Sequence, residues 1–304
     1  MSKSAFVFPG QGSQYVGMLK DLHEKFNEVK SFIQEANEIL GFEISKIMFE
    51  GPIDTLKLTD ITQPAIFIHS IAILKLLKNI NPDMAAGHSL GEYSALVSAS
   101  AMTFEDGLKL VRLRGQAMLD AGIKQPGTMA AIVGLNPEVV EEICSTASES
   151  GIVQCANFNS PGQIVISGSI DGVRKAIELS KQKGAKLAKE LVVSGAFHSP
   201  LMELAKEKLH SKLNETNIIN AAFPVFANVT AAATTDANEI KNLLFRQLTS
   251  PVRWDETIKN MIKAGATKFY EIGPGKVLQG LIKRIDPSVE VFGIDTAVDI
   301  ERFI

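Results

Sequence analysis

Cysteine is scarce in this chain of 304 residues, which contains only two, and tryptophan occurs once. The two cysteines, Cys144 and Cys155, are well separated along the chain and have no histidine cluster nearby. This spacing favours neither a zinc site nor a disulfide framework. We therefore expect no metal, and two unpaired thiols are typical of a protein of the reducing cytoplasm.

An excess of positive charge is also lacking, because 31 basic residues are balanced by 34 acidic ones and the formal net charge is -3. Such a chain has no general attraction to nucleic acid or to an anionic membrane surface. Long hydrophobic runs are missing too. The longest apolar region, 66–80, is interrupted by His69, Lys75 and Lys78, which predicts a buried amphipathic helix and no membrane span. Residues 1–4 lead into a strand without the features of a signal peptide, and since no apolar surface stripe stands out we expect a monomer.

Helices and strands alternate over the first 120 or so residues, as in an α/β domain. Residues 5–8 read as a strand and are followed by a Gly-rich turn. Apolar residues at steps of three and four from Leu19 to Leu40 then predict one long helix that ends at Gly41. The later elements expected of this domain are helices 200–214, 239–248, 254–264 and 277–285 and strands 224–227 and 268–272.

The pattern changes after residue 124. Residues 125–194 are predicted to form a βαββαβ unit, which is the split βαβ or ferredoxin-like arrangement. Residues 1–124 and 195–304 would then form one α/β-hydrolase-like catalytic domain with a mostly parallel sheet, and the small domain would be an insertion in it.

A serine in a GxSxG pattern is the strongest functional signal. The pattern spans 87–91, follows the apolar run 84–86 and opens a predicted helix over 90–99. Small residues on either side allow a strained strand-to-helix turn, which exposes the Ser89 hydroxyl and directs the backbone N–H of Leu90 to the same space. The pattern also arises by chance in loops, but the flanking strand and helix favour the catalytic interpretation.

The Gly-rich turn at 9–14 has two interpretations. A strand, a Gly turn and a helix suggest a dinucleotide site, but Tyr15 stands where the GxGxxG pattern needs its third glycine. The alternative is that the glycines allow backbone amides near Gln11 to approach another site closely.

A serine hydroxyl is a poor nucleophile near neutral pH, so Ser89 needs a general base. Two of the five histidines fall on charged helices, His69 falls in an apolar pattern typical of a core histidine, and His88 points away from the serine along its strand. His198 lies in a loop where the inserted unit returns to the large domain, and such loops commonly line clefts. His198 is our candidate base, with helix capping as the alternative. No acid is evident to orient it; an acid between residues 89 and 198 stays open, with a backbone carbonyl as the alternative.

The predicted helix from Thr103 to Ala121 carries two arginines. Thr103 and Asp106 resemble a capping box at its start. Arg112 shares a solvated stripe with polar residues, whereas Arg114 shares a row with apolar residues and points inward. A buried guanidinium needs an anionic partner, which is either an internal carboxylate or the carboxylate of a substrate.

Six short segments spread over nearly the whole chain share a family-like pattern. They are 8–14 (FPGQGSQ), 62–65 (TQPA), 87–92 (GHSLGE), 157–163 (NFNSPGQ), 195–199 (GAFHS) and 271–275 (EIGPG). In residues and in order, they resemble the malonyl-CoA:acyl carrier protein transacylases of fatty acid synthesis, which are related to the acyltransferase domains of polyketide synthases.

The resemblance implies a cofactor-free acyltransferase with malonyl-CoA as donor and acyl carrier protein as acceptor. The implied site comprises Ser89 as nucleophile, His198 as base and acid, Gln11 and Leu90 as oxyanion-hole amides, Arg114 as clamp for the malonyl carboxylate, Asn159, Phe197 and His88 as substrate contacts, and Gln247 as the residue whose backbone carbonyl orients the histidine. In the family, a phenylalanine at position 197 accompanies a preference for malonyl groups over methyl-branched ones.

Rival functions remain open at this stage. A serine hydrolase of short acyl thioesters or a polyketide-type acyltransferase would use the same site, and a scaffold for the carrier protein would leave it vestigial. Arg114 argues against the hydrolase, and the intact Ser89, His198 and Arg114 argue against the scaffold. Because carrier proteins of this family are acidic, the lysine-rich stretch 181–189 of the small domain is a candidate docking surface, although a lysine run is also typical of a solvated face.

Overall fold

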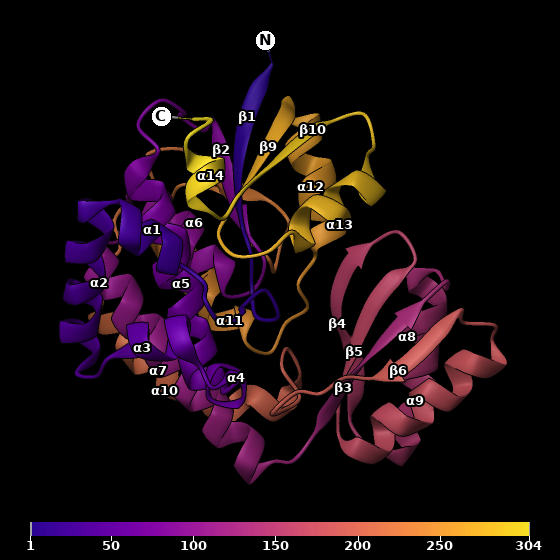
Figure 1. Cartoon of the computed structure of the whole chain (residues 1–304). Coiled ribbons are helices and arrows are strands. Elements are labelled where there is room, and N and C mark those ends of the chain that lie inside the picture. Colours follow the sequence, from indigo (N-terminus) through magenta and orange to yellow (C-terminus); the bar gives the residue numbers. More distant parts are fainter. Residues whose placement is uncertain (1, 304) are drawn as a thin grey trace.

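The structure, a computed structural model that describes residues 2–303, contains two β-sheets (Figure 1). The larger sheet has six strands in the order β10-β9-β1-β2-β7-β8. Neighbouring strands run parallel except β7 and β8, so the sheet is mostly parallel, as predicted. Its strands are β1 (Lys3–Phe8), β2 (Met84–Gly87), β7 (Val225–Phe226), β8 (Ala233–Thr234), β9 (Ala266–Ile272) and β10 (Glu290–Ile294).

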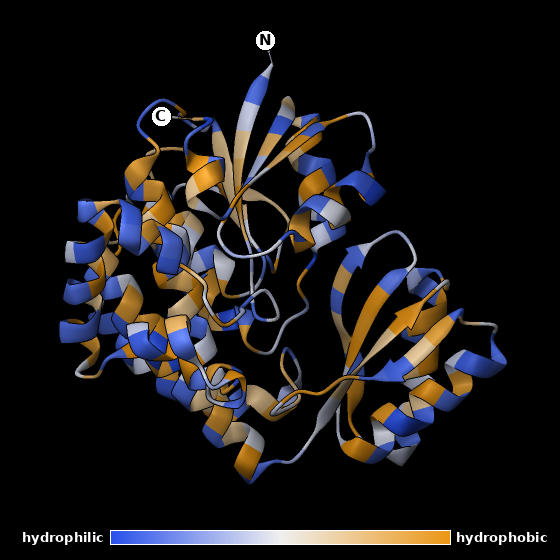
Figure 2. Ribbon diagram, viewed as in Figure 1, coloured by the Kyte–Doolittle hydropathy of each residue, from blue (hydrophilic) through white to orange (hydrophobic). Residues whose placement is uncertain are grey.

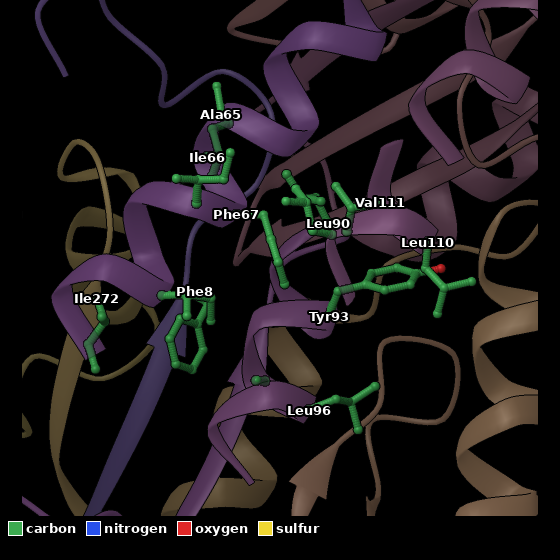
Figure 3. Packing of buried hydrophobic residues seen from close by; sticks show 14 of the residues in the cluster. Phe8, Ala65, Ile66, Phe67, Leu90, Tyr93, Leu96, Leu110, Val111 and Ile272 are labelled. Atoms are coloured by element: carbon green, nitrogen blue, oxygen red, sulfur yellow. The ribbon is translucent and has the colours of Figure 1, made fainter. Parts of the chain in front are cut away.

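Side chains of β1 alternate between two layers of helices. Val7 belongs to an apolar cluster formed with α12 (Trp254–Lys263) and α13 (Val277–Ile285). Phe8 faces the opposite way into a larger cluster, part of which Figure 3 shows around Phe8 and Phe67. Burial on both faces explains why the sequence of β1 is a continuous apolar run and not an alternating one.

The large part contains further helices, nearly all of whose buried apolar residues belong to the larger cluster. They are α1 (Lys20–Lys25), α2 (Asn27–Leu40), α3 (Ile44–Glu50), α4 (Ile53–Leu56), α5 (Thr59–Leu76), α6 (Gly91–Ser98), α7 (Phe104–Lys124), α10 (Glu203–Glu215), α11 (Ala237–Gln247) and α14 (Ala297–Ile300), with a 3-10 turn, η2, at Pro200–Met202. Across the described residues, no helix combines the length and apolar character needed to cross a membrane.

The single long helix expected up to Leu40 is wrong. Phe26 has an extended backbone, with φ -114° and ψ 119°, and separates α1 from α2. Its side chain nevertheless packs against the larger apolar cluster, which preserves the apolar periodicity across the break. The expected end of the helix is confirmed, because Gly41 caps α2 in the left-handed region with φ 74°.

The helix expected over 66–80 begins earlier and is buried on nearly all sides, so it is less amphipathic than its pattern indicates. Pro64 within α5 leaves the carbonyl of Asp60 without its helical partner, because proline has no N–H. The guanidinium of Arg112 donates to that carbonyl, and its Nη1 atom lies 2.9 Å from the Asp60 carboxylate. Arg112 is therefore paired and partly buried, and its expected place in a solvated stripe is wrong.

The second sheet follows the predicted βαββαβ order. Its elements are β3 (Thr128–Val133), α8 (Pro137–Ala147), the 3-10 turn η1 (Ser148–Ser150), β4 (Val153–Ser160), β5 (Gln163–Gly168), α9 (Ile170–Gln182) and β6 (Leu187–Glu190). The strands lie in the order β4-β5-β3-β6 with antiparallel neighbours, which is the ferredoxin-like arrangement. This unit has an apolar cluster of its own, which includes the free Cys144 and Cys155, and Figure 2 shows hydrophobic residues along β5.

The small sheet joins the large part through its edge strand β4. The N–H of Phe158 donates to the carbonyl of Val252 over 2.9 Å, and the N–H of Val252 donates to the carbonyl of Ala156 over 2.8 Å. Arg284 on α13 donates from Nη1 to Oε1 of Gln163, at the start of the neighbouring strand β5, over 2.6 Å. These contacts pair part of an otherwise open sheet edge and set the two parts beside one another.

Candidate active site

Ser89 lies on a sharp turn between β2 and α6. Its φ of 52° is in the left-handed region, which residues other than glycine rarely adopt. The glycines on either side are required by close packing. A Cβ at Gly87 would lie 1.8 Å from the carbonyl carbon of Gly91, and a Cβ at Gly91 would lie 2.1 Å from the carbonyl oxygen of Phe8. The GxSxG spacing thus produces a strained turn of the nucleophile-elbow type.

Asn228, which sequence reasoning missed, holds this turn from the next strand of the sheet. Its Oδ1 atom accepts a 2.6 Å hydrogen bond from the N–H of Ser89, and its Nδ2 atom donates over 2.6 Å to the carbonyl of Gly87. Asn228 is buried and follows β7, which pairs with β2. The signal in the sequence is therefore only indirect: a polar residue at the carboxyl end of a neighbouring parallel strand.

His198 lies against the serine, with its Nε2 atom 2.8 Å from the Ser89 Oγ atom. Its Nδ1 atom lies 2.9 Å from the carbonyl oxygen of Gln247 and 3.2 Å from that of Ser250. Carbonyl oxygens only accept hydrogen bonds, so Nδ1 carries the proton and Nε2 presents a lone pair to the hydroxyl. Burial, and then the neighbouring charge of Arg114, lower the pKa of His198 to about 3, so the ring is neutral at neutral pH.

Arg114 on α7 is 1% exposed and points inward, as predicted. Its Nη1 atom donates to Oε1 of Gln63 over 2.7 Å, and its Nη2 atom donates to Oε1 of Gln247 over 2.9 Å and to Oγ of Ser89 over 3.1 Å. Within residues 2–303 no carboxylate lies within ion-pair distance of this guanidinium. A fully buried cation therefore reaches the serine hydroxyl while its direct partners are all neutral.

Two residues beside the serine have backbone N–H groups that are unpaired among the described residues. Gln11 and Leu90 both line the cavity at Ser89, and no protein group among the described residues accepts from either N–H. The loop that carries Gln11 approaches the turn closely at Gly10, where a Cβ would lie 2.5 Å from the carbonyl oxygen of His88. The glycines of segment 9–14 thus permit the close approach that was one of the two interpretations of this turn.

The cavity between the two parts of the chain has a volume of about 300 Å³. Eight of the nine residues implied by the resemblance line it, and Gln247 lies behind Arg114 and His198. The small sheet contributes Asn159, whose Oδ1 atom lies 2.9 Å from Nε2 of His88, so His88 pairs across the cavity and not with Ser89. Among residues 2–303, no group of three or more His, Cys, Asp and Glu side chains is placed to hold a metal ion.

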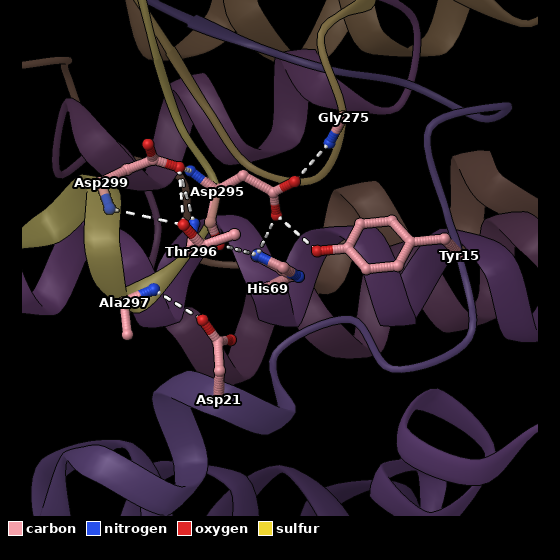
Figure 4. A network of polar contacts seen from close by, with 8 residues as sticks. All are labelled: Tyr15, Asp21, His69, Gly275, Asp295, Thr296, Ala297 and Asp299. Carbon is pink, nitrogen blue, oxygen red and sulfur yellow. Dashed lines mark hydrogen bonds and ion pairs between the residues drawn. The ribbon is translucent and has the colours of Figure 1, made fainter.

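Asp295 joins two loops that border the cavity (Figure 4). Its carboxylate accepts from the hydroxyl of Tyr15 and from the N–H of Gly275, each over 3.0 Å, and it lies 3.0 Å from Nε2 of His69. Tyr15 follows the loop of Gln11, and Gly275 precedes α13, which also lines the cavity. His69 is fully buried, which confirms that it is a core histidine.

A family model described as "Acyl transferase domain" matches residues 5–293. This chain belongs to the acyl transferase family. The match spans both sheets, so the acyl transferase contains the small βαββαβ unit within its family region.

Curated relatives carry the name "Malonyl CoA-acyl carrier protein transacylase". The protein from Bacillus subtilis (strain 168) is 47% identical over 307 residues, which cover 100% of this chain and 97% of the relative. The protein from Staphylococcus aureus (strain MRSA252) is 45% identical over 302 residues, which cover 99% of this chain and 98% of the relative.

Solved structures give the same result. An acyl carrier protein S-malonyltransferase from Vibrio cholerae matches the acyl transferase with a TM-score of 0.95 and 44% identity over 99% of each chain. A malonyl-transacylase in complex with a type II PKS acyl-carrier protein matches with a TM-score of 0.96 and 40% identity, over 99% of this chain and 98% of that one. The resemblance and the fold class predicted from the sequence are confirmed.

Proposed function

We propose that this acyl transferase moves a malonyl group from malonyl-CoA to the phosphopantetheine thiol of acyl carrier protein, through an ester on Ser89, and so supplies the extender unit for fatty acid synthesis. The observation that carries the proposal is Arg114: a buried guanidinium 3.1 Å from the Ser89 hydroxyl, with no carboxylate of the described chain beside it. A guanidinium binds a carboxylate by two parallel hydrogen bonds. The malonyl carboxylate supplies that missing partner.

The first half-reaction follows from the geometry. As the Ser89 oxygen attacks the thioester carbonyl carbon, its proton passes to Nε2 of His198, 2.8 Å away. The carbonyl oxygen becomes negative and takes hydrogen bonds from the N–H groups of Gln11 and Leu90. When the carbon–sulfur bond breaks, the CoA sulfur leaves with the proton from His198. Ser89 then holds the malonyl group as an ester.

The second half-reaction runs the same steps in reverse with another thiol. The phosphopantetheine thiol gives its proton to His198 and its sulfur attacks the ester carbonyl. The ester carbon–oxygen bond breaks, and the Ser89 oxygen recovers the proton. Donor and acceptor use one cavity in turn, which is ping-pong kinetics. Neither half needs a cofactor, because the serine carries the acyl group between the two thiols.

We also propose partners and specificity from the lining of the cavity. Phe197 is 6% exposed and lines the cavity, where its ring would crowd an α-methyl group on the donor. Asn159 and His88 would contact the substrate from the other side. The acidic carrier protein would dock on the exposed lysines at 181, 183, 186 and 189. Exchanging these lysines for glutamate should raise the KM for the carrier protein without changing loading from malonyl-CoA.

Compartment and assembly belong to the same proposal. We place the enzyme in the cytoplasm, since both cysteines are free, as suits a reducing medium. We also expect it to be a monomer.

Intact-mass measurement after mixing with malonyl-CoA tests the proposal. The wild-type protein should gain one malonyl group, and Ser89→Ala should gain none. Adding acyl carrier protein that bears phosphopantetheine should move the malonyl group to the carrier. A malonyl adduct on Ser89→Ala would overturn the assignment of Ser89 as the nucleophile. An adduct that passes to water as fast as to the carrier thiol would instead identify a hydrolase of short acyl thioesters.

A further inference from the structure

Glu92 is a buried acid close to the serine, and the mechanism above makes no use of it. It lies on α6 three residues after Ser89 and is 3% exposed. Its Oε2 atom accepts two hydrogen bonds, one from Nε2 of Gln247 over 2.8 Å and one from the N–H of Asn228 over 3.1 Å. A buried carboxylate is costly unless it compensates a charge.

The amide of Gln247 connects Glu92 to Arg114. Its Nε2 atom faces the Glu92 carboxylate and also donates to the carbonyl of Ser89 over 3.0 Å, and its Oε1 atom accepts from Nη2 of Arg114. The carboxylate fixes this orientation, because a reversed amide would set its NH2 group against the guanidinium. The negative charge that compensates Arg114 thus lies one residue behind the cavity, and the guanidinium is left without a carboxylate of its own.

Few other charges face Glu92. Arg114 approaches from α7 and Tyr93 is its neighbour on α6, whereas α11 and the segment after β7 present only the amides of Gln247 and Asn228. Burial raises the pKa of Glu92 to about 7, against the opposing effects of the two hydrogen bonds and of Arg114. Burial also raises the pKa of Tyr93, to about 12, so Tyr93 is neutral throughout the neutral range.

We propose that Glu92 is a positioning residue, which acts as counter-ion to Arg114 through the Gln247 amide and takes up a proton from solvent when a substrate carboxylate binds to Arg114. This inference rests on the proposed function. A malonyl carboxylate brings a second negative charge to a site with one cation. Both hydrogen bonds to Glu92 end at Oε2, so a proton on Oε1 neutralises Glu92 and breaks neither of them.

The sign of the effect follows from linkage. If binding of malonyl takes up a proton, the form with protonated Glu92 binds malonyl more tightly. The preference for malonyl-CoA over acetyl-CoA therefore rises as the pH falls through the pKa of Glu92 and decreases above it. The ratio of the two donors isolates this effect, because both carry CoA and both use His198. A rise of one unit in the pKa of Glu92 on binding corresponds to about a tenfold change in the ratio.

The experiment is quenched loading of Ser89, followed by intact mass, with malonyl-CoA and with acetyl-CoA from about pH 6 to about pH 8.5. In the wild type the malonyl-to-acetyl ratio of kcat/KM should fall by about tenfold over this range. Glu92→Gln keeps an acceptor oxygen for both hydrogen bonds but no charge, so its ratio should be independent of pH and equal to the acidic wild-type value. Glu271→Gln is the matched control, because Glu271 is also buried with a pKa raised to about 7 and should leave the slope in place.

A malonyl-to-acetyl ratio that is independent of pH in the wild type would overturn the inference while leaving the proposed function intact. This measurement uses only the wild-type protein, so it does not depend on the folding of a variant. A slope that persists in Glu92→Gln would overturn it as well. Absence of any malonyl ester on Ser89 would overturn the proposed function itself.

Discussion

His198 directs its Nδ1 atom to the backbone carbonyl oxygen of Gln247, 2.9 Å away. In a Ser-His-Asp triad a carboxylate takes this place and stabilises the charged imidazolium. A peptide carbonyl is neutral, so it fixes the tautomer and the ring orientation with much less effect on charge. Burial and the nearby cation of Arg114 then dominate, and together they lower the pKa of this base to about 3.

The low pKa of His198 makes the native state sensitive to acid. Between its ordinary pKa of 6.5 and about 3, the unfolded chain binds a proton at His198 that the native state does not, so stability falls as the pH falls through this window. His198→Gln should reduce this loss by about 1.4 kcal/mol per pH unit. Urea unfolding of both proteins at several pH values between about 4.5 and about 6.5 measures it. Ser89→Ala, which keeps the histidine, is the control, and equal slopes for wild type and His198→Gln would contradict the prediction.

Replacement of Arg114 should abolish donor selectivity. Arg114→Ala removes the carboxylate partner, and we expect malonyl loading to fall by about 10²-fold, the equivalent of about 3 kcal/mol of charge-assisted hydrogen bonding. Acetyl loading should change much less. Arg114→Lys keeps the charge without the planar fork and should give an intermediate ratio. Competition between malonyl-CoA and acetyl-CoA, followed by intact mass, measures the ratio of the two loading rates. An unchanged ratio in Arg114→Ala would contradict the binding of the malonyl carboxylate by Arg114.

A smaller side chain at Phe197 should admit branched donors. Phe197→Ala opens space beside the cavity, and loading from methylmalonyl-CoA relative to malonyl-CoA should rise by about tenfold, since one methyl group in a tight pocket is worth about 1 to 3 kcal/mol. Phe197→Leu should lie between the alanine variant and the wild type. A direct competition of the two donors on one enzyme sample would show this. A ratio insensitive to the size of residue 197 would place the α-methyl group elsewhere.

Loss of Asp295 should destabilise the fold more than loss of any one of its partners. Asp295→Ala leaves the Tyr15 hydroxyl and the N–H of Gly275 unpaired and removes the carboxylate beside His69, whose Nε2 atom keeps only the backbone carbonyl of residue 295. Breaking this buried network should cost about 3 kcal/mol in the free energy of unfolding. Tyr15→Phe removes one hydrogen bond of the same network and should cost about 1 kcal/mol. Chemical denaturation of the two variants compares them. Equal losses would show that the carboxylate does not tie the two cavity loops together.

Local patterns in the sequence were sufficient to predict an element where residues close together along the chain define it. The turn at Ser89 was predictable because Gly87 and Gly91 allow contacts that a Cβ would block. The start of α7 was predictable because Thr103 accepts a hydrogen bond from the N–H of Asp106. In the small unit, apolar alternation and turn residues were enough to give the element order. The contact of Gly87 with Gly91 and the hydrogen bond of Thr103 lie within a few residues along the chain, whereas Gly91 also packs against the distant Phe8.

Contacts between distant segments were less predictable. Asn228 and Gln63 reach the site from elements that the sequence does not connect to Ser89 or Arg114 by any local rule. Strand β8 has only two residues and exists through its pairing with β7, so apolar alternation gives no sign of it. The break between α1 and α2 at Phe26 was not predicted for a different reason: the side chain of Phe26 keeps the helical spacing of apolar residues, while its backbone is extended.

The two segments that lead into and out of the small unit touch one another. A Cβ at Gly122 would lie 2.3 Å from the carbonyl oxygen of Ser194 and 3.2 Å from the Cα of Gly195. A unit whose two ends meet at one point behaves as a cassette, because its transfer to another scaffold constrains only a single junction. Chimaeras that exchange this cassette between relatives should therefore transplant whatever carrier-protein selectivity it confers while the host retains its own serine and arginine.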